Sequence, residues 1–231
     1  MNGAPQDLRP LIAIGVPAGD RVHTEFAQCL WGLGRGAKNH RQGIVFGASS
    51  MITNARNQCV DGAHQVNADY ICFVDSDMTY PYQTNDILLS HKKDIVCATY
   101  VRRGPPFDIL GHSKHEKDRD ARAGLVEMDY IPTGILLIKM TVFEKLYKPF
   151  FRFIFTQAEV KGFKGEGFTK GEDFYFSQAA REAGFSLWCD LDLSKEIAHM
   201  YQYGLRITDP AVKQTRDQYN QMQKDLKVAN G

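Results

Sequence analysis

Two aspartates, Asp75 and Asp77, follow a run of apolar and aromatic residues from Tyr70 to Val74. Such a run is typical of a strand buried within a parallel sheet, and ligands of open parallel sheets bind beyond the carboxyl ends of the strands. Two carboxylates two residues apart at that edge can face one hard divalent cation, Mg²⁺ or Mn²⁺, which prefers oxygen ligands. The alternative is a polar turn, because Asp and Ser are common turn residues.

Arg56 lies on the apolar side of an expected helix, residues 51–66. On a wheel of about 100° per residue, the helix has an apolar stripe that includes Ile52, and Arg56 lies about 40° from Ile52. A guanidinium in this position must find an anion, since an unpaired buried charge is costly. Two anions are open: the phosphates of a nucleotide, or a structural carboxylate such as Asp75.

Glu172 and Asp173 follow Gly171 at the expected start of another helix. Acidic residues in a first helical turn complement the helix dipole, which is the simpler explanation. An acid placed there by a Gly-rich loop can also act as a general base toward a substrate hydroxyl. His199, which follows two apolar residues, is either a structural histidine or a metal ligand.

The residues named above must be positioned by secondary structure, and along the first hundred positions expected strands alternate with expected helices. The apolar runs have no polar face, which indicates a parallel sheet covered by helices on both sides, and hence an α/β fold. Expected strands are 11–16, 43–46, 70–74, 95–98, 134–138 and 185–189, and expected helices are 22–33, 51–66, 84–91 and 172–183. Residues 103–124 and 156–171 are expected to be loops because Gly and charged residues are frequent there.

Composition excludes several classes of protein. The 231 residues carry 28 Lys and Arg against 27 Asp and Glu, a balance that indicates no nucleic-acid partner. No apolar run is long enough to predict a membrane span, and the first ten residues do not have the pattern of a secretion signal. The five cysteines are widely spaced and include no Cys-x-x-Cys pair, which favours reduced thiols and a cytoplasmic protein.

Taken in order, these pieces resemble the nucleotide-diphospho-sugar glycosyltransferases of the GT-A fold, particularly small family-two-like enzymes. The resembling segments span residues 11 to about 200 and are Ile12–Pro17, Ala55–Asn57, Phe73–Met78, Pro132–Gly134, Gly171–Phe174, Glu182–Phe185 and His199. The resemblance implies a Rossmann-like, mostly parallel central sheet with helices on both faces. It also implies a nucleotide-diphosphate sugar donor, a saccharide or other hydroxyl acceptor, and Mn²⁺ or Mg²⁺.

The resemblance further implies a role for each residue of the site. Asp77 and His199 are expected to bind the metal, and Asp75 to contact the ribose or to reach the metal through water. Asp173 is expected to deprotonate the acceptor with support from Glu172, which favours inversion at the sugar. The residues expected to contact the nucleotide are Pro17, Ala18, Gly19, Arg56 and Ser76. Residues 47–50 contain no acid to recognise a nucleobase, so UDP, GDP and dTDP remain open.

Two further segments have alternative interpretations. Lys161, Lys164 and Lys170 either close over the diphosphate or form a solvated basic loop. We expect a transferase domain over residues 1–208 and a helical tail over residues 209–231. The tail repeats apolar positions at heptad spacing, which favours packing on its own domain or a homodimer; these positions are Val212, Thr215, Tyr219, Met222 and Leu226.

Two other functions compete with glycosyl transfer. A non-catalytic sugar-nucleotide-binding module needs Asp75 and Asp77 but does not need Glu172 and Asp173. A sugar nucleotidyltransferase normally has a Gly-rich phosphate loop with Lys or Arg after the first strand, and residues 15–21 match that pattern poorly.

Overall fold

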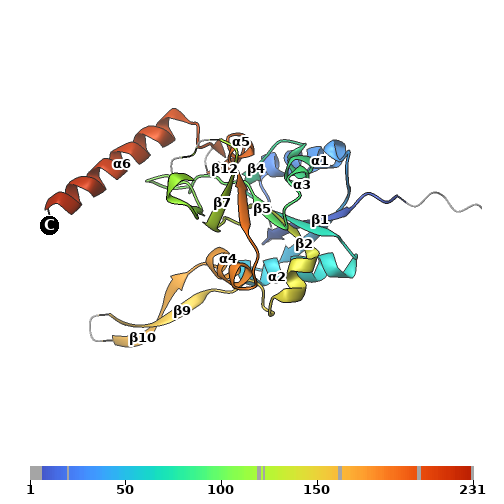
Figure 1. Ribbon diagram of the computed structural model, residues 1–231, viewed down its shortest axis with the longest axis horizontal. Helices are drawn as coiled ribbons and strands as arrows, with labels where there is room; N and C mark the ends of the chain where they lie inside the picture. The colour runs from blue at the N-terminus through green and yellow to red at the C-terminus, as the bar shows by residue number, and fades with distance from the viewer. Residues whose placement is uncertain are drawn as a thin grey trace, which may run out of the picture.

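The computed structural model describes residues 7–19, 21–118, 121, 123–160, 163–201 and 204–229. Within these ranges, the side chains of residues 116, 156–160, 163–169, 204–205 and 226–229 are not described. The architecture is mixed α/β, with helices on both sides of a large central sheet (Figure 1).

The central sheet has eight strands in the order β2-β1-β3-β8-β5-β11-β7-β6. Their bounds, in that order, are Arg41–Ala48, Leu11–Ala18, Tyr70–Val74, Ile135–Lys139, Ile95–Cys97, Leu187–Asp190, Leu125–Tyr130 and His112–Ser113. The helices that accompany it are α1 (Thr24–Gly36), α2 (Ile52–Gln65), α3 (Thr84–Ser90), α4 (Glu172–Glu182) and α5 (Leu191–Ser194), with 3-10 turns η1 (Glu116–Asp118) and η2 (Met140–Lys145).

The sheet is not mostly parallel, so that prediction was wrong. β1 pairs in parallel with β2 and β3, and β5 with β11, but the other four pairings in the sheet are antiparallel. β8 runs antiparallel to both of its neighbours, β3 and β5, which therefore point in the same direction as each other. A strand buried on both faces is apolar throughout in either direction, so the composition of 134–138 predicted a buried strand but not its orientation.

Each face of the sheet has its own core, as the apolar runs predicted. Side chains of β3 alternate between the two: Ile71 and Phe73 pack with residues of α2 and α4, whereas Cys72 and Val74 pack with residues of α1, α3 and α5. Figure 1 shows α1, α3 and α5 on one side of the sheet and α2 and α4 on the other. Four of the five cysteines are buried in these cores.

A β-hairpin replaces the loop that we expected over residues 156–171. β9 (Ile154–Val160) pairs antiparallel with β10 (Phe163–Lys170), and the hairpin projects from the body of the molecule (Figure 1). The glycines and lysines of this segment are the reason that we expected a loop. Of the three lysines expected to close over the diphosphate, Lys161 lies outside the described residues, as does the side chain of Lys164. The described residues of segment 103–124 are mainly irregular, as expected, apart from β6 and η1.

A second, three-stranded sheet has the order β13-β12-β4, formed by Gly204–Leu205, Ala198–Met200 and Met78–Thr79. β4 follows directly after Asp77, so this sheet fixes the chain beyond the two aspartates. None of these three short strands was predicted, because two or three residues are too few to show a period.

The final helix, α6 (Pro210–Ala229), extends away from the body (Figure 1). It is anchored at its start by Val212, which is buried with Val101 against Phe107, Ile109 and Ile207. Further along the predicted seam, Tyr219 is 37% exposed and Met222 is 50% exposed. The homodimer and the domain boundary at residue 208 both stay predictions. No helix in the described part of the chain is long and apolar enough to cross a membrane.

Candidate active site

The residues expected to do chemistry gather at the carboxyl edge of the parallel strands. β1 and β3 pair in parallel as far as Gly15 and Phe73, so Pro17 and Asp75 each lie two residues beyond the last pair. On the other side, β12 pairs with β4 so that His199 is opposite Met78, and the Met200 amide donates to the Asp77 carbonyl at 2.8 Å. Antiparallel pairing thus brings residue 199 beside residue 77.

Arg56 is the buried centre of the cluster, with 2% of its surface exposed. Its Nη2 lies 3.0 Å from Oδ2 and 2.9 Å from Oδ1 of Asp75. Its Nε donates to Oε1 of Glu172 at 3.3 Å, and its Nη1 donates to the Thr133 carbonyl at 3.2 Å. The ion pair with Asp75 therefore confirms the structural alternative for Arg56, while the nucleotide contact stays a prediction.

Asp75 is held in place but retains an acceptor. Its amide donates to the Gly134 carbonyl at 2.9 Å, and Oδ2 accepts the hydrogen bond from Arg56. Oδ1 is close to Arg56 but has no partner with hydrogen-bond geometry among the described residues. Burial raises the pKa of Asp75, and the charge of Arg56 opposes that effect. Oδ1 is thus a buried acceptor that a ligand hydroxyl or a metal-bound water can use.

Asp77 is about as exposed as Asp75, at 19% against 21%, but has two cationic side chains beside it. Its Oδ2 is 3.4 Å from Nε2 of His199 and 3.0 Å from Nη1 of Arg103. Burial raises the pKa of Asp77, but its contacts with His199 and Arg103 outweigh that effect, so the pKa lies below its ordinary value. The carboxylate is consequently ionised and available to a cation at neutral pH.

His199 is oriented by the chain before Arg103. Its Nδ1 lies 2.9 Å from the Val101 carbonyl, and because a carbonyl only accepts, Nδ1 carries the proton. The ring also packs edge-on against Tyr100, with 5.2 Å between the ring centres. A backbone carbonyl that binds one ring nitrogen is the usual way to direct the other nitrogen at a metal. Nε2 is the nitrogen that faces Asp77.

Asp173 stands at the entrance of α4, next to Glu172. Its Oδ1 accepts from the Phe174 amide at 2.8 Å. Burial raises the pKa of Asp173, opposed by that hydrogen bond, which suits a group that must take a proton. Glu172 instead contacts Arg56. Burial raises the pKa of Tyr100, and the charges of Asp75 and Asp173 add to this effect.

The donor atoms of Asp77 and His199 fit one divalent ion. Two ligands about 2.1 Å from an ion, at an angle between about 90° and 110°, are roughly 3.0 to 3.4 Å apart. Their separation is 3.4 Å. No group of three or more His, Cys, Asp or Glu side chains forms a metal site within the described residues, and Asp75 is engaged by Arg56. The pair therefore fits an ion that takes its other ligands from phosphate and water, as Mg²⁺ commonly does.

The remaining predicted residues lie at the same edge with backbone ties to their neighbours. The Ser76 carbonyl accepts from the His23 amide, and the Ala18 carbonyl accepts from the Ser49 amide, both at 3.2 Å. Pro17 and Gly19 flank Ala18 at the end of β1. The structure brings these residues to the strand ends beside Asp75, and their contact with a nucleotide stays a prediction.

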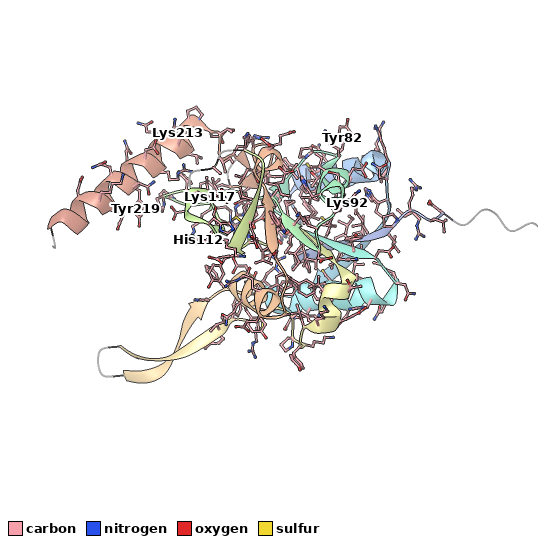
Figure 2. All side chains as sticks on the ribbon, in the orientation of Figure 1. Tyr82, Lys92, His112, Lys117, Lys213 and Tyr219 are labelled. Atoms are coloured by element: carbon pink, nitrogen blue, oxygen red, sulfur yellow. The ribbon has the colours of Figure 1, made fainter. Side chains whose placement is uncertain are left out.

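A cavity of about 810 Å³ lies between the central body and the start of α6. Its walls come from Thr99 and segment 108–113 on one side and from Lys213, Arg216 and Asn220 of α6 on another. Figure 2 labels two of the lining side chains, His112 on β6 and Lys213 on α6. The lining mixes cations, carboxylates and amides, a set that can hydrogen-bond a polyhydroxylated ligand.

Three contributors to the site were missed by the sequence reasoning: Tyr100, Val101 and Arg103. The Tyr100 hydroxyl accepts from the Gly134 amide at 2.9 Å, and so connects the irregular segment after β5 to the segment that holds Asp75. Arg102 and Arg103 precede Gly104, Pro105 and Pro106, and this pattern indicates a turn that carries two positive charges. Nothing in their sequence indicated that Arg103 would reach Asp77.

Comparisons with known proteins show the fold and leave the activity open. No family model matches this chain, and no curated protein matches its sequence. Among solved structures, the chain is similar to the crystal structure of A197 from STIV, with a TM-score of 0.54. The match covers 84% of this chain and 86% of that chain at 18% sequence identity. At this identity the similarity concerns the α/β architecture alone.

Proposed function

We propose that this protein is a metal-dependent glycosyltransferase, which moves a sugar from a nucleoside-diphosphate donor to a hydroxyl acceptor. The observation that carries the proposal is the convergence of Asp77 and His199, with 3.4 Å between their donor atoms, at the carboxyl edge of the parallel strands. In open α/β sheets this edge is where ligands bind. The residues meet there although they are more than a hundred positions apart.

Charge explains what the cluster does in such a reaction. Departure of the nucleoside diphosphate builds negative charge, and Mn²⁺ or Mg²⁺ bound to Asp77 and His199 would neutralise it. Arg56 holds Asp75 in place, and Oδ1 of Asp75, which lies 2.9 Å from Nη2 of Arg56 but has no hydrogen-bond partner among the described residues, would accept from a ribose hydroxyl. Glu172 is the second carboxylate partner of the buried Arg56 guanidinium.

Asp173 is the proposed general base. Its raised pKa and its position at the entrance of α4, beside the Arg56 cluster, support removal of a proton from the acceptor hydroxyl. A base that activates the acceptor for direct attack gives inversion at the sugar. None of the residues of the proposed site lines the cavity beside α6, so the acceptor is not assigned to that cavity.

The test is a screen of UDP-, GDP- and dTDP-sugars for Mn²⁺-dependent transfer or hydrolysis. Asp77→Asn should lose Mn²⁺-dependent donor binding and turnover together. Asp173→Asn should keep donor binding and lose turnover by about 10² to 10⁴, the usual contribution of a general base. Asp61→Asn is the matched control, because Asp61 is an exposed residue of α2 that forms an ion pair with Lys148.

Other outcomes separate the competing functions. Donor binding without turnover under any condition would identify a sugar-nucleotide-binding module. Release of pyrophosphate from a nucleoside triphosphate and a sugar phosphate would identify a nucleotidyltransferase. Full turnover in Asp77→Asn would remove the metal from the proposal.

A further inference from the structure

Arg103 is carried by a well-anchored turn beside the proposed metal ligands. Val101 and Ile109 form an antiparallel bridge, the Arg102 amide donates to the Asp108 carbonyl at 2.9 Å, and the Phe107 amide donates to the Gly104 carbonyl at 3.0 Å. Val101 is buried, and its carbonyl is the one that binds His199. The same turn therefore orients the imidazole and presents the guanidinium.

Arg103 and His199 converge on one oxygen atom. Oδ2 of Asp77 is 3.0 Å from Nη1 of Arg103 and 3.4 Å from Nε2 of His199. A divalent ion bound to Asp77 and His199 must approach this same oxygen. Two cations cannot share it closely without strong repulsion, because like charges a few ångströms apart repel each other even at the polarity of a protein surface.

The Arg103 side chain is also free to leave. It is 55% exposed, and Asp77 is the carboxylate that it contacts within the described residues. An ion pair whose cation is this exposed contributes little to stability. Its rupture is therefore easily offset by the binding of another cation or by a new anionic partner for the guanidinium.

We propose that Arg103 occupies the cation position in the free protein and makes metal binding dependent on a diphosphate ligand. The inference rests on the proposed function. Without a diphosphate, the ion must displace Arg103 and leave it close by and unpaired. With a diphosphate bound, Arg103 turns to the phosphate oxygens, which a guanidinium can bind in a bidentate manner, and the ion takes its place on Asp77. Metal and diphosphate then bind with positive coupling, and the coupling is reciprocal.

The experiment measures Mn²⁺ binding by the loss of the free-ion electron paramagnetic resonance signal, with UDP, GDP or dTDP and without nucleotide. The variants are wild type, Arg103→Gln, Arg102→Gln and Asp77→Asn. Arg102→Gln is the matched control. Arg102 is the neighbouring exposed arginine, and its substitution removes the same charge, but in the described structure the ion pair to Asp77 comes from Arg103. Thermal unfolding checks that each variant is folded.

We expect Arg103→Gln to bind Mn²⁺ about tenfold more tightly than wild type without nucleotide, within the usual range of coupling between sites. The nucleotide should tighten Mn²⁺ binding strongly in wild type and at least fivefold less in Arg103→Gln. Arg102→Gln should stay within about twofold of wild type in both measurements.

Three results would overturn the proposal or its basis, and they are distinguishable. Equal Mn²⁺ affinity in wild type and Arg103→Gln, with binding still abolished in Asp77→Asn, would overturn the role of Arg103 and leave the metal site standing. If Arg102→Gln and Arg103→Gln changed the Mn²⁺ affinity equally, the change would come from general surface charge, and the role of Arg103 would likewise be overturned. Mn²⁺ binding that is indifferent to Asp77→Asn, with or without nucleotide, would overturn the metal site and the proposed function with it.

Discussion

Asp75 and Asp77 stand two residues apart, and each is paired with an arginine, yet the two pairs differ in almost every physical respect. Arg56, the partner of Asp75, is 2% exposed, whereas the side chain of Arg103, the partner of Asp77, is 55% exposed. Arg56 also donates hydrogen bonds to Glu172 and to the Thr133 carbonyl. For Arg103, the contact in the described part of the chain is the ion pair with Asp77. One pair is part of the core, and the other lies at the surface of the site.

Burial decides what each pair can do. A buried guanidinium that loses its carboxylates cannot be compensated by water, so the pair with Arg56 is permanent. A half-exposed guanidinium exchanges its carboxylate for water or another anion at small cost. The two aspartates also have pKa shifts in opposite directions, because burial dominates at Asp75 while cationic neighbours dominate at Asp77. The same residue type within one motif thus serves as framework at one position and as ligand at the next.

The largest expected effect is on the buried pair. Arg56→Met leaves Asp75 and Glu172 close together without their common cation, and we expect a loss of about 3 to 5 kcal/mol in the free energy of unfolding. Urea unfolding followed by circular dichroism measures this loss. Adding Asp75→Asn to Arg56→Met should recover part of it, because one uncompensated charge is removed. A loss below about 1 kcal/mol would contradict the framework role of Arg56.

An intermediate effect is expected at the link between the two pairs. Tyr100→Phe removes the hydroxyl that accepts from the Gly134 amide, next to the Thr133 carbonyl that Arg56 binds. The buried amide then has no partner, which costs about 1 to 3 kcal/mol in unfolding free energy. Tyr147→Phe is the control, because Tyr147 is 91% exposed. Equal stability of both variants would show that Tyr100 contributes by packing alone.

The smallest expected effect is on the exposed pair. Arg103→Gln should change the unfolding free energy by less than about 1 kcal/mol, since exposed ion pairs contribute little. The same urea titration measures it beside Arg56→Met. A loss comparable to that of Arg56→Met would mean that Arg103 is a structural residue, and the contrast between the two pairs would fail.

Much of the site could be predicted from local pattern. The position of Arg56 on its helix predicted a buried guanidinium with an anionic partner, and Asp75 is that partner. The approach of His199 to Asp77 was expected from the family resemblance. The second partner of Arg56, Glu172, was not foreseen, because it depends on how α4 packs beside α2. Arg103 was not foreseen either, since a charged loop residue has no period and its contacts depend on the path of the turn.

The amino-acid sequence by itself determined which segments are buried, because apolar runs and helical stripes have no other stable place than the two cores of the sheet. It also determined that one guanidinium lies inside and that two aspartates lie at a strand end. Only the tertiary structure decided the direction of β8, the β9–β10 hairpin and the meeting of Asp77, His199 and Arg103 at a single oxygen. These depend on strand pairing and loop path, where the free energy comes from contacts between segments far apart in the chain, and local composition does not encode them.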